Sequence, residues 1–317
     1  MVTGGNPRKD DPFEQHRSLM FGISYRMLGT VADAEDTIQE TWLRWNKIDQ
    51  SLVADARGYL VRAVTRTSID QLRRAKARRE QYIGSWLPEP LLTGPDVADR
   101  VVQDKLVSMA ILVMLESTSP LERAVFVLRE VFGFSYPEVA QAVGRSDAAV
   151  RQLGHRAKTH LRQPRSRFQA GPRESRRVTE RFLEACLGGD LSELLKVLAP
   201  GVTLWVDAHG TSEGARQPIH GAAAIGEYLA SIAPRYPDGI HFRYAEFNGE
   251  PGGLLAVGRD VYAVVALELE PAGSVAAIRV VRTPEKLSRL NVPPTSSSGT
   301  PSPPPTCRAP RTGRSCP

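Results

Sequence analysis

Basic and amide side chains recur on one side of a helical pattern near the middle of the chain. They fall within the stretch SYPEVAQAVGRSDAAVRQLGHRAKTHLR, residues 135–162. Helical spacing puts the apolar residues of its second half on one face and leaves cations and hydrogen-bond donors on the other. This outward set consists of Arg151, Gln152, His155, Arg156 and Lys158. Arginine and glutamine can form paired hydrogen bonds with base edges in a major groove, and cations attract phosphates. The pattern favours DNA binding over its alternative, a solvated basic face on an ordinary helical hairpin.

Two short helices are needed to position these side chains. Ser135 followed by Glu138 is a capping-box pattern, Gly144 can end the first helix, and Ser146 can cap a second helix that starts at Asp147. The two helices then pack through the apolar residues Val139, Ala140 and Val143 on the first and Val150, Leu153, Ala157 and Leu161 on the second. The stretch therefore predicts a helix-turn-helix, with Arg145 at its turn.

Charge is segregated along an earlier helical unit. The segment VADAEDTIQETWLRW carries only acidic charges, Asp33, Glu35, Asp36 and Glu40, until it reaches Arg44. An acidic helix that ends in Trp42 and Trp45 is typical of a protein-docking surface, although the two tryptophans would equally suit a core.

The next helical segment has the opposite charge. The segment RTSIDQLRRAKARRE contains two acidic and six basic residues. The basic residues are Arg66, Arg73, Arg74, Lys76, Arg78 and Arg79. A long basic helix favours a nucleic-acid surface, and the alternative is again a solvated face. Together with the helix-turn-helix, it would give the chain two separate DNA-binding elements.

Composition limits the remaining possibilities. With 317 residues, 41% hydrophobic and 24% charged, the chain can form two or three globular domains, and its net charge of +6 agrees with an anionic partner. A run of about 18 apolar residues and a hydrophobic signal region are both missing, so we expect a cytoplasmic protein without a membrane span. The three cysteines Cys186, Cys307 and Cys316 fit neither a disulfide framework nor a zinc site. We expect Cys186 in a core, and neither a metal nor a cofactor.

The hydrophobic pattern changes from helical to strand-like halfway along the chain. Helical spacing dominates residues 13–80 and 104–168, which flank a linker over residues 81–103. Residues 172–290 combine short amphipathic helices with alternating segments such as VYAVVALELE, which predicts half-buried antiparallel strands in an α+β domain. We expect Val261, Ala263, Val265, Leu267 and Leu269 on one face of that strand. Residues 1–12 are predicted to be flexible, and the Pro/Ser-rich residues 291–317 to be disordered.

Three segments together resemble regions 2 and 4 of the extracytoplasmic-function sigma factors of bacterial RNA polymerase. They are SYRMLGTVADAEDTIQETWLRW, ARGYLVRAVTRTSIDQLRRAKARRE and LERAVFVLREVFGFSYPEVAQAVGRSDAAVRQLGHRAKTHL, in the expected order and spacing. The hexapeptide WLPEPL in the linker is similar to the signature of one subgroup, which carries a SnoaL-like C-terminal extension. The resemblance implies two all-α sigma domains, at residues 13–80 and 104–168, followed by a SnoaL-like cone at residues 172–290.

The resemblance assigns roles to the charged segments. The acidic helix with Asp33, Glu35, Asp36, Glu40 and Trp42 would bind the clamp helices of the large subunit of core RNA polymerase. The basic helix would melt and hold the minus-10 element through Arg62, Arg66, Arg73, Arg74, Arg78 and Arg79. The helix-turn-helix would read the minus-35 element of promoter DNA through Arg145, Ser146, Arg151, Gln152, His155, Arg156 and Lys158.

The C-terminal extension departs from its subgroup at two motifs. The loop WVDAHGTSEGARQPIHG keeps Asp207 but interrupts the expected Asp-Gly-Gly-Gly-Lys pattern, and TPEKL replaces Asn-Pro-Asp-Lys-Leu. In the subgroup the extension is implied to regulate the sigma domains in cis. We therefore expect a regulatory contact between the linker and the cone, made by Trp86, Leu87, Pro88, Asp207, Thr283, Pro284, Glu285, Lys286 and Leu287.

Two alternatives give the cone another role. It could be a weak enzyme, since Asp207, His209 and His220 fall in one loop region, although a histidine in a glycine-rich loop is more often a turn residue than a catalyst. It could also sense an unknown small ligand, in which case the chain could be an ordinary helix-turn-helix regulator. A closed apolar interior would favour a structural regulator, and an open one with convergent polar groups would favour a sensor or an enzyme. We expect no catalytic residue.

Overall fold

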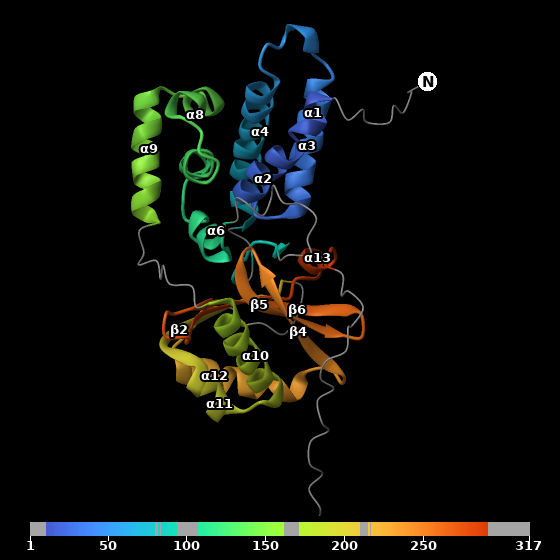
Figure 1. Cartoon of the computed structure of the whole chain (residues 1–317), viewed down its shortest axis with the longest axis vertical. Helices are drawn as coiled ribbons and strands as arrows, with labels where there is room; N and C mark the ends of the chain where they lie inside the picture. The colour runs from blue at the N-terminus through green and yellow to red at the C-terminus, as the bar shows by residue number, and fades with distance from the viewer. Residues whose placement is uncertain are drawn as a thin grey trace, which may run out of the picture.

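A computed structural model describes residues 11–79, 82, 84–93, 107–161, 171–209, 215 and 217–290. Two helical domains lie side by side over one face of a curved sheet, and further helices lie on the other side of the sheet (Figure 1). The predicted flexible N-terminus, except for Asp11 and Pro12, and the predicted tail over 291–317 lie outside the described residues, as do residues 94–106 of the linker region.

The first helical domain consists of four helices and a short 3-10 turn. They are α1 (Pro12–Gln15), α2 (Arg17–Leu28), α3 (Val31–Trp45), η1 (Gln50–Leu52) and α4 (Ala56–Arg79). Gly29 ends α2 in the left-handed conformation, at φ 81°, and the Thr30 hydroxyl then caps α3 by accepting the Asp33 N–H. Because the glycine that ends α2 is followed directly by the threonine that caps α3, the two helices meet at a tight corner.

The second helical domain contains the predicted helix-turn-helix. Its elements are α6 (Met109–Leu115), α7 (Pro120–Phe126), the π-helical turn η2 (Val127–Val131), α8 (Tyr136–Val143) and α9 (Asp147–His160). The structure confirms the capping box of Ser135 and Glu138, the left-handed Gly144 at φ 67° and the Ser146 cap. The predicted apolar contacts between α8 and α9 are also present.

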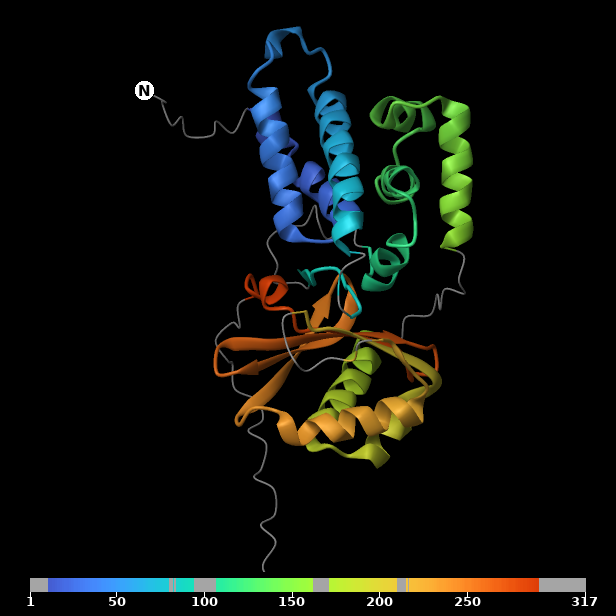
Figure 2. The ribbon, with the colours of Figure 1, turned by 180° about the vertical axis from the view of Figure 1, so that it is seen from behind.

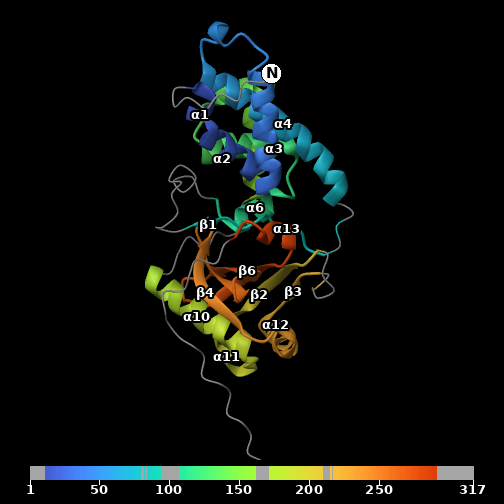
Figure 3. The ribbon, with the colours of Figure 1, turned by 90° about the vertical axis from the view of Figure 1, so that its right-hand side faces the viewer.

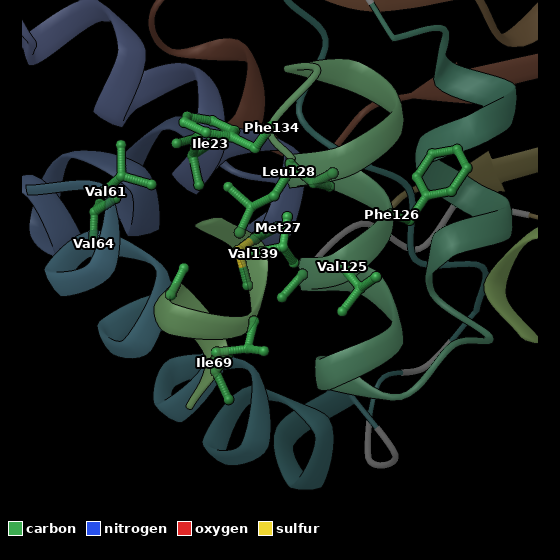
Figure 4. Packing of buried hydrophobic residues seen from close by; sticks show 14 of the residues in the cluster. Ile23, Met27, Val61, Val64, Ile69, Val125, Phe126, Leu128, Phe134 and Val139 are labelled. Carbon is green, nitrogen blue, oxygen red and sulfur yellow. The ribbon is translucent and has the colours of Figure 1, made fainter. Parts of the chain in front are cut away.

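One hydrophobic cluster joins the two helical domains. Figure 4 shows Met27, Val61 and Val64 of the first domain meeting Val125 and Val139 of the second. Arg123, buried between them, donates a hydrogen bond of 2.7 Å to the carbonyl of Met27 in the first domain. Because burial of apolar area is the main driving force of packing, the two domains form one compact body in this structure.

The C-terminal sheet has the strand order β1-β4-β5-β6-β7-β2-β3. Its strands are β2 (Leu198–Asp207), β3 (Ile219–His220), β4 (Ile240–Phe247), β5 (Glu250–Val257), β6 (Asp260–Leu269) and β7 (Val275–Val281), with β1 (Leu92–Thr93) supplied by the linker. Neighbours are antiparallel except for β2 and β7. The linker is therefore an edge strand of the C-terminal sheet.

Helices cover one face of this sheet, and the helical domains approach the other (Figures 2 and 3). The covering helices are α10 (Pro172–Gly188), α11 (Leu191–Val197) and α12 (Ala222–Ile232), followed by the turn η3 (Ala233–Arg235). A last short helix, α13 (Pro284–Leu287), follows β7. This arrangement of helices on a curved sheet is the α+β cone that the sequence predicts.

The two faces of the sheet belong to two different cores. Ala263 and Val265 of β6 pack with the covering helices, whereas Val264 and Ala266 pack with Leu87 of the linker and other residues on the opposite face. The expectation of a half-buried strand is therefore wrong for β6, which is apolar on both sides because both sides are covered. Val261 does not share the face of Ala263, because the register shifts between the pairs Leu255–Ala263 and Ala256–Val261.

Candidate nucleic-acid interface and interdomain junction

Helix α9 presents the predicted DNA-binding side chains to solvent. Arg151, Gln152, His155, Arg156 and Lys158 are all exposed, while Val150 and Ala157 on the other side are fully buried. The Arg151 guanidinium lies 4.3 Å from the centroid of the Tyr136 ring, and Lys158 forms an ion pair of 3.0 Å with Glu130. Arg145 and Ser146 are exposed at the turn that precedes the helix.

Helix α4 carries the other set of predicted DNA contacts. Arg73 and Arg74 are exposed, Arg62 is half-buried, and the side chains of Arg78 and Arg79 lie outside the described part of the chain. Arg66 instead reaches the second domain, where its guanidinium donates to the carbonyls of Ala142 at 3.2 Å and Gln141 at 3.1 Å. A cation at the last carbonyls of α8 also suits the negative end of that helix. In this state one of the residues predicted to contact the minus-10 element is bonded to the second helical domain.

The two tryptophans of the acidic helix α3 differ in exposure. Trp45 is buried with 1% exposure, whereas Trp42 is 44% exposed beside Leu43, which is 48% exposed. Asp36 is exposed as well. The predicted docking residues Asp33, Glu35 and Glu40 are half-buried, with Glu35 paired to Arg17 and Glu40 paired to Arg44. Of the two aromatic candidates, only Trp42 lies on a surface that a partner can reach.

The linker runs between the first helical domain and the C-terminal sheet. Trp86 packs so closely on Gly29, at the end of α2, that a Cβ at residue 29 would lie 2.5 Å from its ring. Leu87 is fully buried in the cluster on the helical-domain side of the sheet, with Val264, Val281 and Leu287 of the C-terminal domain. Pro88 is buried as well. Trp86 therefore packs on the first helical domain, and Leu87 packs into the C-terminal domain.

A buried ion pair fixes the linker to the C-terminal domain. The Asp207 carboxylate, with 0% exposure, accepts from the Leu87 N–H at 2.8 Å and from the Lys286 ammonium at 2.7 Å, and also from the hydroxyls of Tyr82 and Thr283. Lys286 donates a further bond to the Leu87 carbonyl and lies 4.4 Å from the centroid of the Trp86 ring. We call the five residues Tyr82, Leu87, Asp207, Thr283 and Lys286 the linker clamp.

The remaining residues of the predicted TPEKL contact differ in their burial. Leu287 is buried in the same apolar cluster as Leu87, whereas Pro284 and Glu285 are exposed. Tyr82 was missed in the sequence, because a lone tyrosine in a linker carries no signal of its partner. The interrupted glycine loop does not prevent the contact, since Asp207 is the residue that makes it.

Glu89 in the middle of WLPEPL binds the first helical domain in three places. Its N–H donates to the Gly29 carbonyl at 2.8 Å, its carbonyl accepts from the Tyr25 hydroxyl at 2.7 Å, and its carboxylate accepts the Val31 N–H at 2.8 Å, at the start of α3. Burial raises the pKa of Glu89. The linker thus anchors the acidic helix at its N-terminus, where a carboxylate is favoured by the helix dipole.

Asn248 extends this contact to the C-terminal sheet. Its side-chain amide donates to the Tyr25 hydroxyl at 2.8 Å and accepts from the Leu91 N–H at 3.0 Å. It stands at φ 55° in the turn between β4 and β5, which a following glycine completes. The dipeptide Asn-Gly is a strong hairpin signal that sequence reasoning could have used, although not its contact with Tyr25.

A second contact joins the sheet to the start of the second helical domain. The Glu250 carboxylate accepts the Ala110 N–H at 3.3 Å and lies 3.8 Å from Arg279, which is also paired with Glu268 at 2.9 Å. Burial raises the pKa of Glu250, opposed by the charge of Arg279. Both helical domains are therefore tied to the same face of the C-terminal sheet.

The residues considered for catalysis do not converge. Asp207 is enclosed in the linker clamp, the His209 ring stacks on Tyr82 at 4.3 Å, and the exposed His220 lies 3.1 Å from the Thr203 hydroxyl. Among the described residues, no three His, Cys, Asp or Glu side chains are grouped as metal ligands. Within the same residues, none of the helices has the length and apolar character needed to cross a membrane.

Comparison with known proteins agrees with this architecture. The family model of Sigma-70 region 2 matches residues 12–78, and that of Sigma-70 region 4 matches residues 108–161. The chain is 35% identical over 288 residues to the ECF RNA polymerase sigma factor SigJ of Mycobacterium tuberculosis, covering 87% of this chain and 92% of that protein. Its identity to the probable ECF RNA polymerase sigma factor SigI of the same species is also 35%, over 87% of this chain and 93% of SigI.

A solved structure covers the same three parts. The crystal structure of Mycobacterium tuberculosis SigJ matches with a TM-score of 0.70 at 32% identity, over 87% of this chain and 97% of that one. Regions 2 and 4 on one chain define a sigma factor of bacterial RNA polymerase. The chain belongs to the extracytoplasmic-function sigma factors, and it carries a SnoaL-like domain after region 4. It is thus an alternative sigma factor, in a family that binds core RNA polymerase and promoter DNA.

Proposed function

We propose that the SnoaL-like domain regulates this sigma factor in cis by holding the linker, and that the linker clamp keeps regions 2 and 4 in their compact pair. The observation that carries the proposal is the buried carboxylate of Asp207, which accepts bonds from Tyr82 and Leu87 of the linker and from Thr283 and Lys286 of its own domain. A linker held in this way cannot extend without breaking its hydrogen bonds to a buried ion pair of the C-terminal domain.

The compact arrangement of regions 2 and 4 would oppose promoter binding because it engages a basic residue that is predicted to bind DNA. Arg66 of the predicted minus-10 helix is bonded to the end of α8, the first helix of the helix-turn-helix. In the DNA-bound state, α9 would read the minus-35 element, and α4 would hold the melted minus-10 strand through its exposed arginines. Loosening the clamp should therefore raise promoter binding.

The exposed part of α3 supports a docking role for that helix. Trp42 and Asp36 lie on its outer surface, and the predicted partner is the clamp-helix region of the large polymerase subunit. The linker residue Glu89 bonds the first N–H of this helix. Polymerase docking and linker release would therefore act on connected residues, in the cytoplasm where polymerase and chromosome meet.

We further propose that the SnoaL-like domain is a regulator and not an enzyme. In support, the acid that a catalytic reading would use already accepts hydrogen bonds from four residues of the linker clamp.

In vitro transcription with bacterial core RNA polymerase and the full-length protein tests the regulatory proposal. Asp207→Asn removes the charge that Lys286 pairs with, and Asp260→Asn, at the exposed start of β6, is the matched control. We expect more promoter-specific transcript from Asp207→Asn and an unchanged amount from Asp260→Asn, with circular dichroism showing that both fold. Equal transcript from the Asp207 variant and the parent would contradict regulation through the clamp.

A further inference from the structure

The ring of Tyr136, the first residue of α8, contacts two arginines of the second helical domain. The guanidinium carbon of Arg129, in η2, lies 4.7 Å from the ring centroid, and that of Arg151, on α9, lies 4.3 Å from it. Both distances are within the range of about 6 Å at which a guanidinium is attracted to an aromatic ring. The ring therefore connects η2 to the helix that is predicted to read DNA.

The ring stands on a fixed part of the backbone. In the capping box before it, the Glu138 carboxylate accepts the Ser135 N–H at 2.7 Å, and the Ser135 hydroxyl accepts the Glu138 N–H at 3.4 Å. Arg129 is held as well, because its guanidinium donates to the Phe134 carbonyl at 2.9 Å. A tyrosine has only two side-chain torsions, so Tyr136 offers a rigid surface at a small cost in conformational entropy.

Arg151 has no other anchor in the described part of the chain. Its side chain is exposed and forms neither a hydrogen bond nor an ion pair with another described residue, whereas Lys158 of the same helix is paired with Glu130 at 3.0 Å. A long side chain that is ordered only on binding reduces affinity, because its rotamer freedom is then lost. The Tyr136 ring is therefore the group that can order Arg151 before DNA arrives.

Stacking leaves the hydrogen-bond donors of Arg151 available. A guanidinium stacks through its flat face, while its N–H groups point outward in its plane. These donors can still form the paired bonds to guanine O6 and N7 that are the commonest specific contact of arginine in a major groove. Arg151 also lies in the N-terminal half of α9, and the N-terminal residues of a recognition helix are those that contact base edges.

We propose that Tyr136 is a positioning residue of the minus-35 interface, which holds the Arg151 guanidinium in the orientation that reads one base pair. Tyr136 acts through Arg151 and needs no contact of its own with DNA. The inference rests on the proposed reading of the minus-35 element by α9. It is independent of the regulation by the linker clamp.

Two substitutions of Tyr136 test the ring, with a DNA duplex that the full-length parent protein enriches from a random pool. Tyr136→Leu removes the ring and keeps an apolar side chain, and it should weaken binding about threefold to tenfold, the usual cost of ordering one long side chain. Tyr136→Phe keeps the ring and should bind as the parent does. Equal weakening by both would assign the effect to the hydroxyl and overturn the positioning role.

A matched control separates the ring from a general effect of losing an aromatic residue. Tyr244→Leu removes a similar stack, with Arg176 at 5.3 Å, in the C-terminal domain, and should leave DNA binding unchanged. Circular dichroism should show the same helix content and melting temperature for Tyr136→Leu and Tyr136→Phe. A loss of DNA binding in Tyr244→Leu as large as in Tyr136→Leu would overturn the specific role of Tyr136.

The same two positions combined show whether Tyr136 acts through Arg151. Once Arg151→Ala has weakened binding, adding Tyr136→Leu should cause no further loss, and both single variants should relax specificity at the same base pair. Additive losses, or relaxed specificity at different base pairs, would overturn the positioning role and leave the reading of DNA by α9 intact. A parent protein that enriches no duplex, or an Arg151→Ala variant that binds as the parent does, would overturn that reading and the inference with it.

Discussion

Regions 2 and 4 are joined to each other in one way, and the linker is joined to the SnoaL-like domain in another. The first junction is a broad apolar cluster that includes Met27, Val64 and Val139, with a few hydrogen bonds at its border. The second is centred on one carboxylate, Asp207, whose two oxygens take bonds from four residues. One junction is spread over many side chains, and the other depends on one.

This difference indicates different tasks. Apolar contacts are non-directional, so a cluster can lose or shift one side chain and still hold. A buried ion pair is stable only while its full set of bonds is present, because a buried charge left alone is costly. The apolar junction keeps the sigma domains compact in this structure. Under the proposed regulation, the linker clamp would be the place where this compactness is released.

The largest expected effect comes from breaking the clamp. Asp207→Ala leaves the Lys286 ammonium, 8% exposed at its side chain, without its counter-charge. We expect the free energy of unfolding of the C-terminal domain to fall by about 3–5 kcal/mol. Urea denaturation of the full-length protein, followed by circular dichroism, measures the loss. A loss no greater than that of Asp260→Ala would show that both junctions are equally tolerant.

The next effect concerns a side chain that neither junction uses. Arg156 is exposed on α9, so Arg156→Ala should leave folding unchanged and weaken binding of a minus-35 DNA duplex by about 1–3 kcal/mol if it bonds a base edge. Competition between duplexes with single base changes is the measurement, and specificity should relax at one position. A uniform loss on all duplexes, with a smaller salt dependence, would identify a phosphate contact instead.

Removal of Arg66 tests the border of the apolar junction. Arg66→Ala removes two hydrogen bonds to the end of α8 and should lower the free energy of unfolding of the helical body by about 1 kcal/mol. Arg66→Lys keeps the positive charge but removes the guanidinium that donates to two carbonyls. This variant therefore distinguishes the hydrogen bonds to α8 from electrostatic attraction to DNA. A loss as large as that of Asp207→Ala would remove the contrast between the two junctions.

The smallest effect is a pH dependence at the second contact of the sheet. Because burial raises the folded-state pKa of Glu250, the protein binds a proton there that the unfolded chain has lost. Stability should therefore fall as pH rises from the ordinary value of 4.5 through the raised pKa. Urea midpoints measured from about pH 4 to pH 8 should show this fall in the parent and a weaker one in Glu250→Gln. Glu268→Gln, which alters the partly exposed partner of Arg279, should keep it.

Local signals in the sequence predicted the helix-turn-helix well. Ser135, Gly144 and Ser146 each act within a few residues of the backbone they cap, so the sequence around them is sufficient. The outward side of α9 followed from the apolar spacing of its other side. The strands were found in the same way, but alternation could not show that β6 is covered on both faces.

Contacts between segments that are far apart in the sequence were harder to predict. The regulatory residues Leu87, Asp207 and Lys286 were expected only through the family resemblance, and their partner Tyr82 was missed. The contact of Arg66 with α8 joins residues that are 75 and 76 positions apart, and a basic residue in a basic helix gives no sign of it. An apolar pocket between the sheet and helices α10 and α12 was missed for a similar reason, because its described lining residues come from segments far apart in the sequence.

The linker also has a part in protecting the sheet. β1 pairs with the end of β4 at Glu246 and Phe247, and Leu91 exchanges hydrogen bonds with Asn248 beside it. An uncovered strand edge offers unpaired N–H and carbonyl groups that can pair with another chain. When the linker leaves, this edge opens to solvent. The released sigma factor should therefore tend to self-associate unless the linker returns or another surface covers this edge.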